Sequence, residues 1–207
     1  MEDRLIENKA CRVILLGVNE IIGKNGLKSV LNYTGLTKYI DNLPPNDTEK
    51  TGPKISEVAK LSEGIEEIYG KNGARAILLQ VGRMQAKWGV EENPDIAKAA
   101  QTAMSQMSES DRAKVILNYT ADTISKQLDT ETWIEQDGDV YFYKDKSETH
   151  CFNRKSEVPV CHTAVGFLAG LVAWAVGNNG WKVEETGCMA MGEPMCTYRI
   201  SKVDGGQ

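Results

Sequence analysis

Three cysteines and one glutamate near the C-terminus have the residue types and spacing of a metal site. Cys188 and Cys196 flank the segment 191–194, whose Gly and Pro predict a turn across which the two thiols could face each other. Glu185 lies shortly before this turn, and Cys161 lies at the start of a long apolar segment. Three thiolates and one carboxylate can hold Zn²⁺ in tetrahedral coordination. The alternative is that the thiols are buried and pack as small hydrophobic side chains.

The strand expected before Cys188 raises a geometric difficulty for this site. Side chains alternate between the two faces of a regular strand, so Glu184, and not Glu185, would share a face with Cys188. Gly187 could supply an irregularity that brings Glu185 to the same side. A bulge at this point is therefore part of the prediction.

Two histidines could do chemistry of another kind. Either His150 or His162 could be an axial ligand of a tetrapyrrole metal. A lone histidine is more often a surface or hydrogen-bonded residue, and this second interpretation is the one that we favour.

Aromatic residues concentrate in the C-terminal half and could line an apolar cavity, although core packing is the use that we favour for the group as a whole. We assign four of them to a ligand pocket between the long helix and the sheet: Trp133, Tyr141, Phe167 and Trp174. Gly166 and Gly170 share one face of the long helix and would allow close approach of a strand, a helix or a flat ligand. Close packing is the use that we expect of them.

The elements that carry these residues follow a change of pattern at Thr130. Residues 132–136 and 140–144 are β-rich and enclose Asp137-Gly138, which predicts a hairpin. Helical periodicity returns over 159–176, and two further strands are expected at 181–185 and 197–202. Helices come first and a β-rich half that clasps one long helix comes second. This order predicts an α+β fold and not a doubly wound parallel sheet.

The N-terminal half contains an internal repeat. Gly17–Gly35 and Gly64–Gly82 resemble each other, and both contain the sequence GKNG. Each copy reads as a helix, a break at GKNG and a second helix, with Asn-Gly suited to a left-handed cap or a tight turn. GKNG could also be a phosphate loop, but it lacks the P-loop spacing and follows no strand.

The remaining helices and loops of this half are less distinctive. Residues 41–53 are rich in Pro, Asn, Asp and Gly, which predicts an exposed loop. Further helices are expected at 56–69, 94–107 and 110–128, with Ser110 as the N-cap of the last.

Composition excludes several functional classes. The net charge of −5 and the pI of about 5.2 are poor for a nucleic-acid binder, which needs a basic face. The longest apolar run, 165–176, is shorter than the ~18 residues of a membrane span. Five cysteines without a recognisable signal peptide predict a reducing, cytoplasmic location.

The chain also resembles a known family. The segments 161–170 and 183–196 are similar to the C-terminal signature of the 4-vinyl reductase domain, and GKNGLKSVL and GKNGARAIL resemble its earlier helical signature. The resemblance covers residues 64–200 best. This domain occurs alone in bacteriochlorophyll-related proteins, forms the sensor part of aromatic-responsive activators, and is related in fold to a vesicle-tethering subunit.

The resemblance implies a fold, a domain division and a ligand set. The fold is that of nitric-oxide-signalling and Golgi-transport ligand-binding domains: N-terminal helices followed by a small antiparallel sheet packed on a long helix. It implies a helical dimerisation segment over 1–60 and a ligand-binding domain over 61–203. In the aromatic sensors a structural zinc is held by three cysteines and one acidic residue. Carried over, these ligands are Cys161, Glu185, Cys188 and Cys196.

Three functions compete on this basis. The first is a binding or carrier protein for a hydrophobic aromatic or tetrapyrrole molecule, with a structural zinc, serving bacteriochlorophyll or chlorophyll synthesis. The second is a reductase of a precursor's vinyl group, and the third is an assembly factor. The sequence contains no G-x-G-x-x-G, C-x-x-C or iron–sulfur spacing that would supply electrons. We therefore expect ligand binding without a nucleotide cofactor.

We also expect a homodimer formed by the N-terminal helices. The resemblance suggests it, and two apolar stripes would need covering. The stripes consist of Ile14, Val18 and Ile21 in the first helix and Val58, Leu61 and Ile65 in the second.

Overall fold

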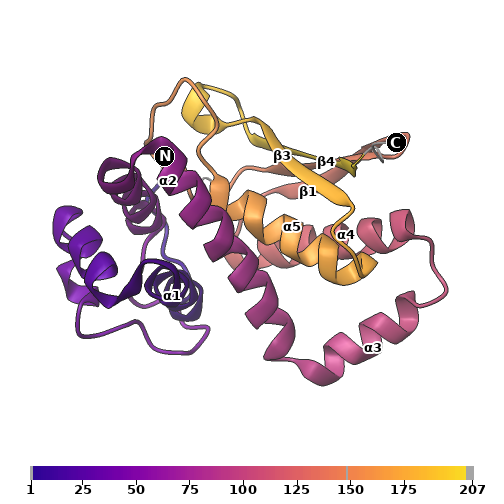
Figure 1. The fold of residues 1–207 in the computed structure, drawn as a ribbon, viewed down its shortest axis with the longest axis horizontal. Helices are drawn as coiled ribbons and strands as arrows, with labels where there is room; N and C mark the ends of the chain where they lie inside the picture. The colour runs from indigo at the N-terminus through magenta and orange to yellow at the C-terminus, as the bar shows by residue number, and fades with distance from the viewer. Residues whose placement is uncertain (1, 148, 204–207) are drawn as a thin grey trace.

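The computed structural model describes residues 2–147 and 149–203. The helices α1 (Asn8–Tyr33) and α2 (Ile55–Glu91) form one end of the molecule. The helices α3 (Pro94–Met104), α4 (Glu109–Leu128) and α5 (His162–Val176) lead to and support a sheet at the other end (Figure 1). The second half of α2 runs from the helical end to the sheet end and so joins the two.

The repeat forms two broken helices. In α1 the break is at Gly23, with φ 73° and ψ 168°, and in α2 it is at Gly70, with φ 71° and ψ 166°. This backbone region is essentially restricted to glycine. The predicted break is therefore confirmed, but its location within GKNG was wrong: the first glycine turns the chain, and Asn-Gly continues into the next helix.

The two copies pack against each other in a reciprocal way. Gly17, the first residue of one copy, lies against Val81, and a Cβ at Gly17 would be 3.0 Å from Val81 Cγ1. Gly64, the equivalent residue of the other copy, lies against the methyl group of Thr34, which is the equivalent of Val81. The missing side chains let α1 and α2 approach closely.

The apolar stripes of these two helices are mostly buried within the chain. Ile14, Val18, Val58, Leu61 and Ile65 are all buried in a shared helical core. Only Ile21 of the six is exposed, at 39%. The homodimer is still a prediction, but the stripes do not provide its surface.

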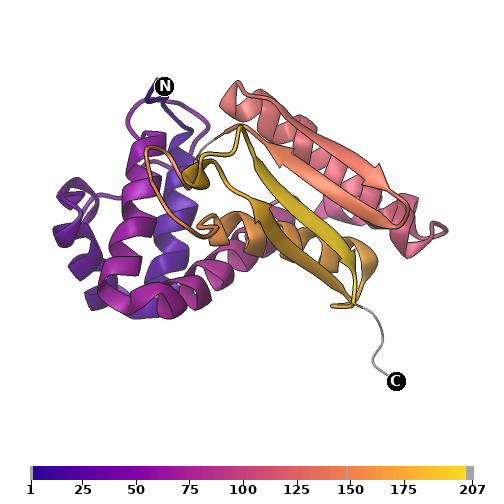
Figure 2. The same cartoon turned by 90° about the horizontal axis from the view of Figure 1, so that it is seen from above.

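The sheet is antiparallel throughout, in the order β1-β2-β4-β3. Its strands are β1 (Thr132–Asp137), β2 (Val140–Asp145), β3 (Trp181–Gly187) and β4 (Cys196–Lys202). The four strands were expected within two residues of these bounds. Helices α4 and α5 lie along one face of the sheet (Figure 2). The α+β class and the arrangement of a small sheet on a long helix are confirmed.

Helix α5 packs on the second half of α2 through glycines. A Cβ at Gly166 would overlap the carbonyl of Leu79, and one at Gly82 would overlap the carbonyl of Thr163. Gly170 sits against Ala86, whose Cβ would be 2.7 Å away. The close packing expected of Gly166 and Gly170 is thus confirmed, and the partner is a helix.

Two helix starts differ from the sequence predictions. Helix α5 begins at His162 and not at Pro159, so the preceding residues are free to form an irregular approach to it. Helix α4 begins at Glu109, and its N-cap is Ser108, whose hydroxyl accepts a hydrogen bond from the backbone N–H of Asp111. Ser110 instead contacts the hydroxyl of Tyr141, 2.7 Å away.

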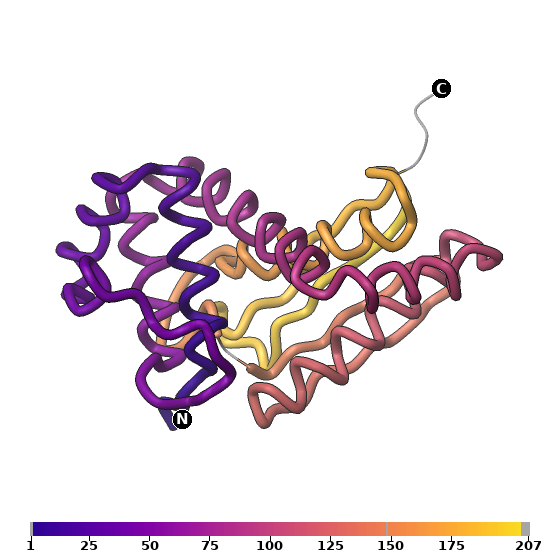
Figure 3. Tube along the Cα trace, turned by 90° about the horizontal axis from the view of Figure 1, so that it is seen from below, coloured from indigo at the N-terminus to yellow at the C-terminus, as the bar shows by residue number. Residues whose placement is uncertain are grey.

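The predicted domain boundary between residues 60 and 61 falls inside α2. The helical core and the core beneath the sheet are distinct clusters of buried residues, yet α2 reaches both. Figure 3 shows the part of this helix after the break at Gly70 running from the helical end toward α5. Among the described residues, no helix has the length and apolar character needed to cross a membrane.

Candidate functional site

Four buried cysteines meet where the sheet, α5 and the segment after β2 come together. Cys161 is the residue immediately before α5, Cys188 follows β3, and Cys196 begins β4. The fourth is Cys151, which lies in the connection between β2 and α5. The four sulfur atoms all lie within 4.8 Å of one another. Three of these cysteines were predicted to form a site, and Cys151 was not.

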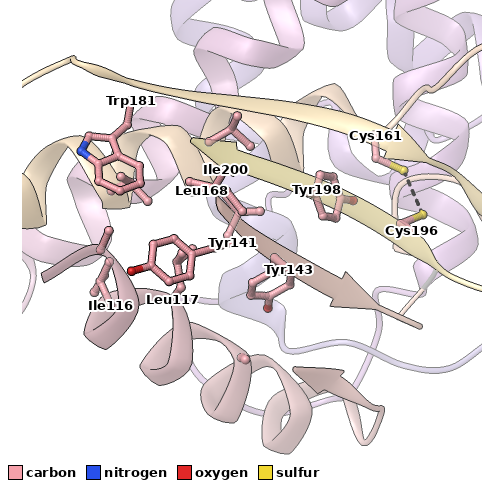
Figure 4. Close-up of a cluster of buried hydrophobic side chains, with 14 of the residues drawn as sticks. Ile116, Leu117, Tyr141, Tyr143, Cys161, Leu168, Trp181, Cys196, Tyr198 and Ile200 are labelled. Atoms are coloured by element: carbon pink, nitrogen blue, oxygen red, sulfur yellow. Dashed lines mark hydrogen bonds between the residues drawn. The ribbon is translucent and has the colours of Figure 1, made fainter. Parts of the chain in front are cut away.

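The sulfur separations suit one tetrahedral metal ion. They are 3.6 Å for Cys151–Cys196, 3.7 Å for Cys161–Cys196 and 3.8 Å for Cys161–Cys188. A metal bound by thiolates at about 2.3 Å in a tetrahedron separates its sulfur ligands by about 3.8 Å. All five cysteines of the chain are free thiols. Figure 4 shows the Cys161 and Cys196 side chains pointing toward each other.

Glu185 borders this cluster, and the predicted bulge brings it there. The β3–β4 register shifts between Glu185 and Gly187, so Glu185 pairs with Tyr198 on the inner face while Glu184 pairs with Arg199 on the outer face. Oε2 of Glu185 accepts a hydrogen bond of 2.8 Å from the backbone N–H of Cys161. Oε1 is buried and has no hydrogen-bond partner among the described residues.

The thiols and the carboxyl group influence one another's protonation. Hydrogen bonds with the neighbouring thiols, that of Cys151 first, lower the pKa of Cys188, whereas they raise the pKa of Cys161. Burial, together with the negative charge at Cys188, raises the pKa of Glu185 to about 8. The cluster therefore favours one thiolate, at Cys188, among protonated neighbours, and a cation bound there would favour loss of the other thiol protons.

A cavity of about 210 Å³ lies next to the cluster, between the helical end and the sheet. The N-terminal part of α1 contributes Ile14, the end of α4 contributes Ile124, and α5 contributes Phe167 and Leu168. The inner face of the sheet contributes Tyr143 and Tyr198, whose rings meet edge to face. The walls are mostly apolar.

A few polar side chains also line the cavity. Burial raises the pKa of both Tyr143 and Tyr198, so their hydroxyls stay protonated and can donate hydrogen bonds. Burial lowers the pKa of His150 to about 4, which leaves its imidazole uncharged at neutral pH. Nδ1 of His150 is buried and has no hydrogen-bond partner among residues 2–147 and 149–203.

The predicted ligand residues are not all at this cavity. Phe167 lines it, but Trp133, Tyr141 and Trp174 are not among its lining residues. Trp133 pairs with Lys144 on the outer face of the sheet, opposite to the face of Tyr143. Tyr141 is buried beside Trp181 (Figure 4). The centroids of the two rings are 6.1 Å apart. The four-residue pocket is still a prediction.

Sequence reasoning missed Cys151 and Tyr198, and it considered His150 only as an axial ligand and Tyr143 only as one of several aromatic residues that could line a cavity. His150 and Cys151 lie in a connection without a repeating pattern, so nothing local fixes where they point. One signal was available: four of the five cysteines fall after residue 150. For the tyrosines, strand alternation from the buried Tyr141 to Tyr143 was the usable signal.

Comparison with protein families supports the resemblance seen in the sequence. The V4R domain model matches residues 139–202, which include β2, α5, β3 and β4. This confirms the resemblance to the 4-vinyl reductase family over that part of the chain. No curated protein matches the sequence.

Solved structures share the fold at low sequence identity. The phenol-responsive sensory domain of the transcription activator PoxR, solved with phenol, has a TM-score of 0.50 and 16% identity over 76% of this chain and 78% of that chain. An H-NOX protein from S. oneidensis in the Fe(II)NO state has a TM-score of 0.57 and 13% identity, covering 93% and 99%. A protein whose heme redox potential is modulated by porphyrin distortion has a TM-score of 0.59 and 14% identity, covering 95% and 99%.

Proposed function

We propose that the protein binds one compact aromatic molecule in the cavity between α1, α5 and the sheet. The observation that carries this proposal is the apolar cavity with the unpaired Nδ1 of His150 in its wall. Apolar walls with a few placed polar groups are typical of small-molecule sites. The hydroxyls of Tyr143 and Tyr198 would orient a polar substituent, and the apolar walls would hold the ring.

The cavity size favours a small ligand over a tetrapyrrole. Pockets for drug-sized molecules hold about 300–1,000 Å³, and this cavity holds about 210 Å³. A single-ring or two-ring molecule fits that space, whereas a tetrapyrrole would require α1 and α5 to move apart. The phenol-bound sensory domain and the heme protein among the structural neighbours support small-molecule binding in this fold in general. The predicted role in bacteriochlorophyll synthesis depends on the larger ligand.

Calorimetric titration with phenol and with a divinyl chlorophyll precursor tests the proposal. We expect saturable binding of phenol, and we expect Ala164→Phe, which fills the cavity, to weaken it at least tenfold because the ring loses its space. Trp133→Ala, on the outer face of the sheet, is the matched control and should leave the affinity within about twofold. Binding of the precursor alone, or equal losses in the two variants, would contradict the assignment of this cavity.

We propose that the chain alone does not catalyse reduction of a vinyl group. The polar groups of the cavity are neutral hydrogen-bonding groups and carboxylates, and none of these side chains is an electron carrier. Incubation of the divinyl precursor with reduced nicotinamide and the purified protein should leave the vinyl group unchanged. Steady turnover would favour the reductase interpretation instead.

We also propose that a zinc ion bound at the cysteine cluster is structural. The sulfur separations fit a closed tetrahedral site, and a closed site leaves no position for a reacting water. Zinc there would tie β3, β4 and the start of α5 together. The five free thiols also support the proposed cytoplasmic location, where cysteines stay reduced.

We propose that a homodimer forms through a smaller surface than the two apolar stripes predicted from the sequence. Ile21 and Ile68, at equivalent positions of the repeat, are 39% and 41% exposed, and Tyr69 is 39% exposed. Tyr69 lies beside Gly26, so the two GKNG breaks are neighbours. Light scattering at micromolar concentration should give about twice 22.8 kDa. A mass of 22.8 kDa would exclude this dimer.

A further inference from the structure

Three consecutive residues after β2 enter three different environments. His150 lines the cavity, Cys151 belongs to the sulfur cluster, and Phe152 is buried in the helical core with α1 and α2. They lie in segment 149–161, which connects β2 to α5 and contains no helix or strand. Whatever fixes Cys151 therefore fixes part of the cavity wall.

The C-terminal end of the segment is held by the buried Val160 and Cys161, and the part between the triplet and Val160 has two polar contacts to other elements among the described residues. Arg154 forms an ion pair of 2.6 Å with Glu66 of α2, and the backbone N–H of Ser156 donates to the carbonyl of Ala190 at 2.9 Å. A segment without regular backbone pairing has little local stability of its own. A bond between Cys151 and an ion held by the sheet would restrain it strongly.

The geometry also distinguishes two ways to complete the metal site. The set whose ligand atoms all lie within 4.8 Å of one another is the four cysteines, and among the described residues Glu185 is not a member of it. Cys151 is 3.6 Å from Cys196, close to the separation expected in a tetrahedral site. Glu185 already accepts a hydrogen bond from the backbone of Cys161 and so positions the start of α5.

We propose that the metal site has four sulfur ligands, with Cys151 in the place predicted for Glu185, and that metal binding thereby fixes the His150 wall of the cavity. The chain then links two sites through one peptide segment. Linkage is reciprocal, so a ligand that requires the ordered wall also raises the affinity for the metal. The first half of this proposal rests on the proposed zinc ion, and the second half also rests on the proposed ligand binding in the cavity.

Metal binding by matched variants tests the ligand set. Zinc affinity is measured by chelator competition on the full chain, and the Co²⁺-substituted protein reports thiolate ligands by its sulfur-to-cobalt absorbance. Cys151→Ser should weaken zinc binding ~100-fold and lower that absorbance. Glu185→Gln should retain the wild-type cobalt spectrum. Cys11→Ser, at a buried cysteine remote from the cluster, should match the wild type in both.

Two results would overturn the ligand set. One is a wild-type protein that binds no zinc under reducing conditions. The other is the reverse pattern, in which Cys151→Ser keeps the wild-type cobalt spectrum and Glu185→Gln changes it. Circular dichroism of each variant shows whether it is folded, and Cys151→Ala offers a second substitution if the serine variant is not.

Hydrogen exchange and phenol titration test the coupling separately. Zinc should slow amide exchange in residues 149–156 of the wild type but not of Cys151→Ser. The comparison is restricted to these residues because Cys161, the other ligand of segment 149–161, remains in the variant. No slowing of these amides in the wild type would contradict the restraint of this segment by the metal. Removing zinc should weaken phenol binding at least fivefold, whereas Ala164→Phe should weaken phenol binding and leave zinc affinity unchanged. If phenol never binds but zinc still slows amide exchange, the proposed function fails, whereas the restraint of this segment by the metal is retained. Phenol affinity that is independent of zinc would overturn the coupling.

Discussion

The two copies of the N-terminal repeat share a sequence pattern and a local geometry but differ in what surrounds them. Both helices break at the first glycine of GKNG with nearly the same backbone angles, at Gly23 and Gly70. The last glycine of the first copy, Gly35, has no neighbouring atom within 4 Å of its Cβ position. Its equivalent, Gly82, lies against the backbone of α5. Local sequence therefore decides the break, and the tertiary neighbour decides what the final glycine is for.

The largest expected effect comes from Gly82→Ala. The added methyl group would overlap the carbonyl of Thr163 and approach the backbone of Phe167, so α2 and α5 would have to separate. We expect a loss of about 3 kcal/mol in the free energy of unfolding, measured by urea denaturation. Gly35→Ala, which meets only the strain of a positive φ, should lose about 1 kcal/mol. Equal losses would mean that the α2–α5 contact is not close.

Alanine substitutions at the two helix breaks should destabilise the protein equally. Gly23→Ala and Gly70→Ala each place a Cβ in a backbone region that is almost exclusive to glycine, with no neighbouring atom within 4 Å. We expect each to lose about 2 kcal/mol in the free energy of unfolding, because the strain is local. Circular dichroism melts of the two variants provide the comparison. A difference above about 1 kcal/mol would show that tertiary contacts also shape one of the breaks.

Alanine substitutions at the reciprocal contact between the two repeat copies should destabilise the protein less. The two substitutions should also differ from each other. Gly64→Ala would overlap the methyl group of Thr34, whose hydroxyl is held by the Val30 carbonyl at 2.8 Å, so we expect a loss of about 1–2 kcal/mol. Gly17→Ala meets Val81 at 3.0 Å and should lose less. Thr34→Ser removes the clashing methyl group and should recover part of the loss in Gly64→Ala. The absence of any recovery in this double-mutant cycle would contradict the contact.

The smallest expected effect is a loss of stability at high pH. Burial raises the pKa of Cys11 in α1 from 9.0 to about 12, and the apolar Val58 is buried at the equivalent position of α2. Below pH 9 both the folded and the unfolded state hold the proton, and above it the unfolded state releases the proton first. Stability therefore falls as pH rises from 9 toward 12, by about 1 kcal/mol at pH 10.

Cys11→Val removes this group and should match the wild type at pH 7 within about 1 kcal/mol. Urea midpoints of the two proteins should diverge only above pH 9, in favour of the variant. Parallel pH profiles would show that folding does not raise the pKa of Cys11.

The sequence by itself determined the order of the elements. Asp137-Gly138 between β-rich runs gave the hairpin, and the recurring GKNG gave the two helix breaks, because these features depend on a few adjacent residues. The bulge near Gly187 was also predictable, since only an irregular strand could place Glu185 beside Cys188. Helix starts were less accurate, because Ser108 and Ser110 are both competent N-caps.

Only the tertiary structure decided which residues share a site. Cys151 reaches Cys196 through a connection with no periodic pattern, and Trp133 was separated from Phe167 by its position on the outer face of the sheet. The cavity also needs walls from α1, α4, α5 and two strands, which no local pattern can bring together. Short-range propensities fix backbone geometry over a few residues, whereas a site depends on long-range packing. In this chain that packing includes the close glycine contact of α2 with α5.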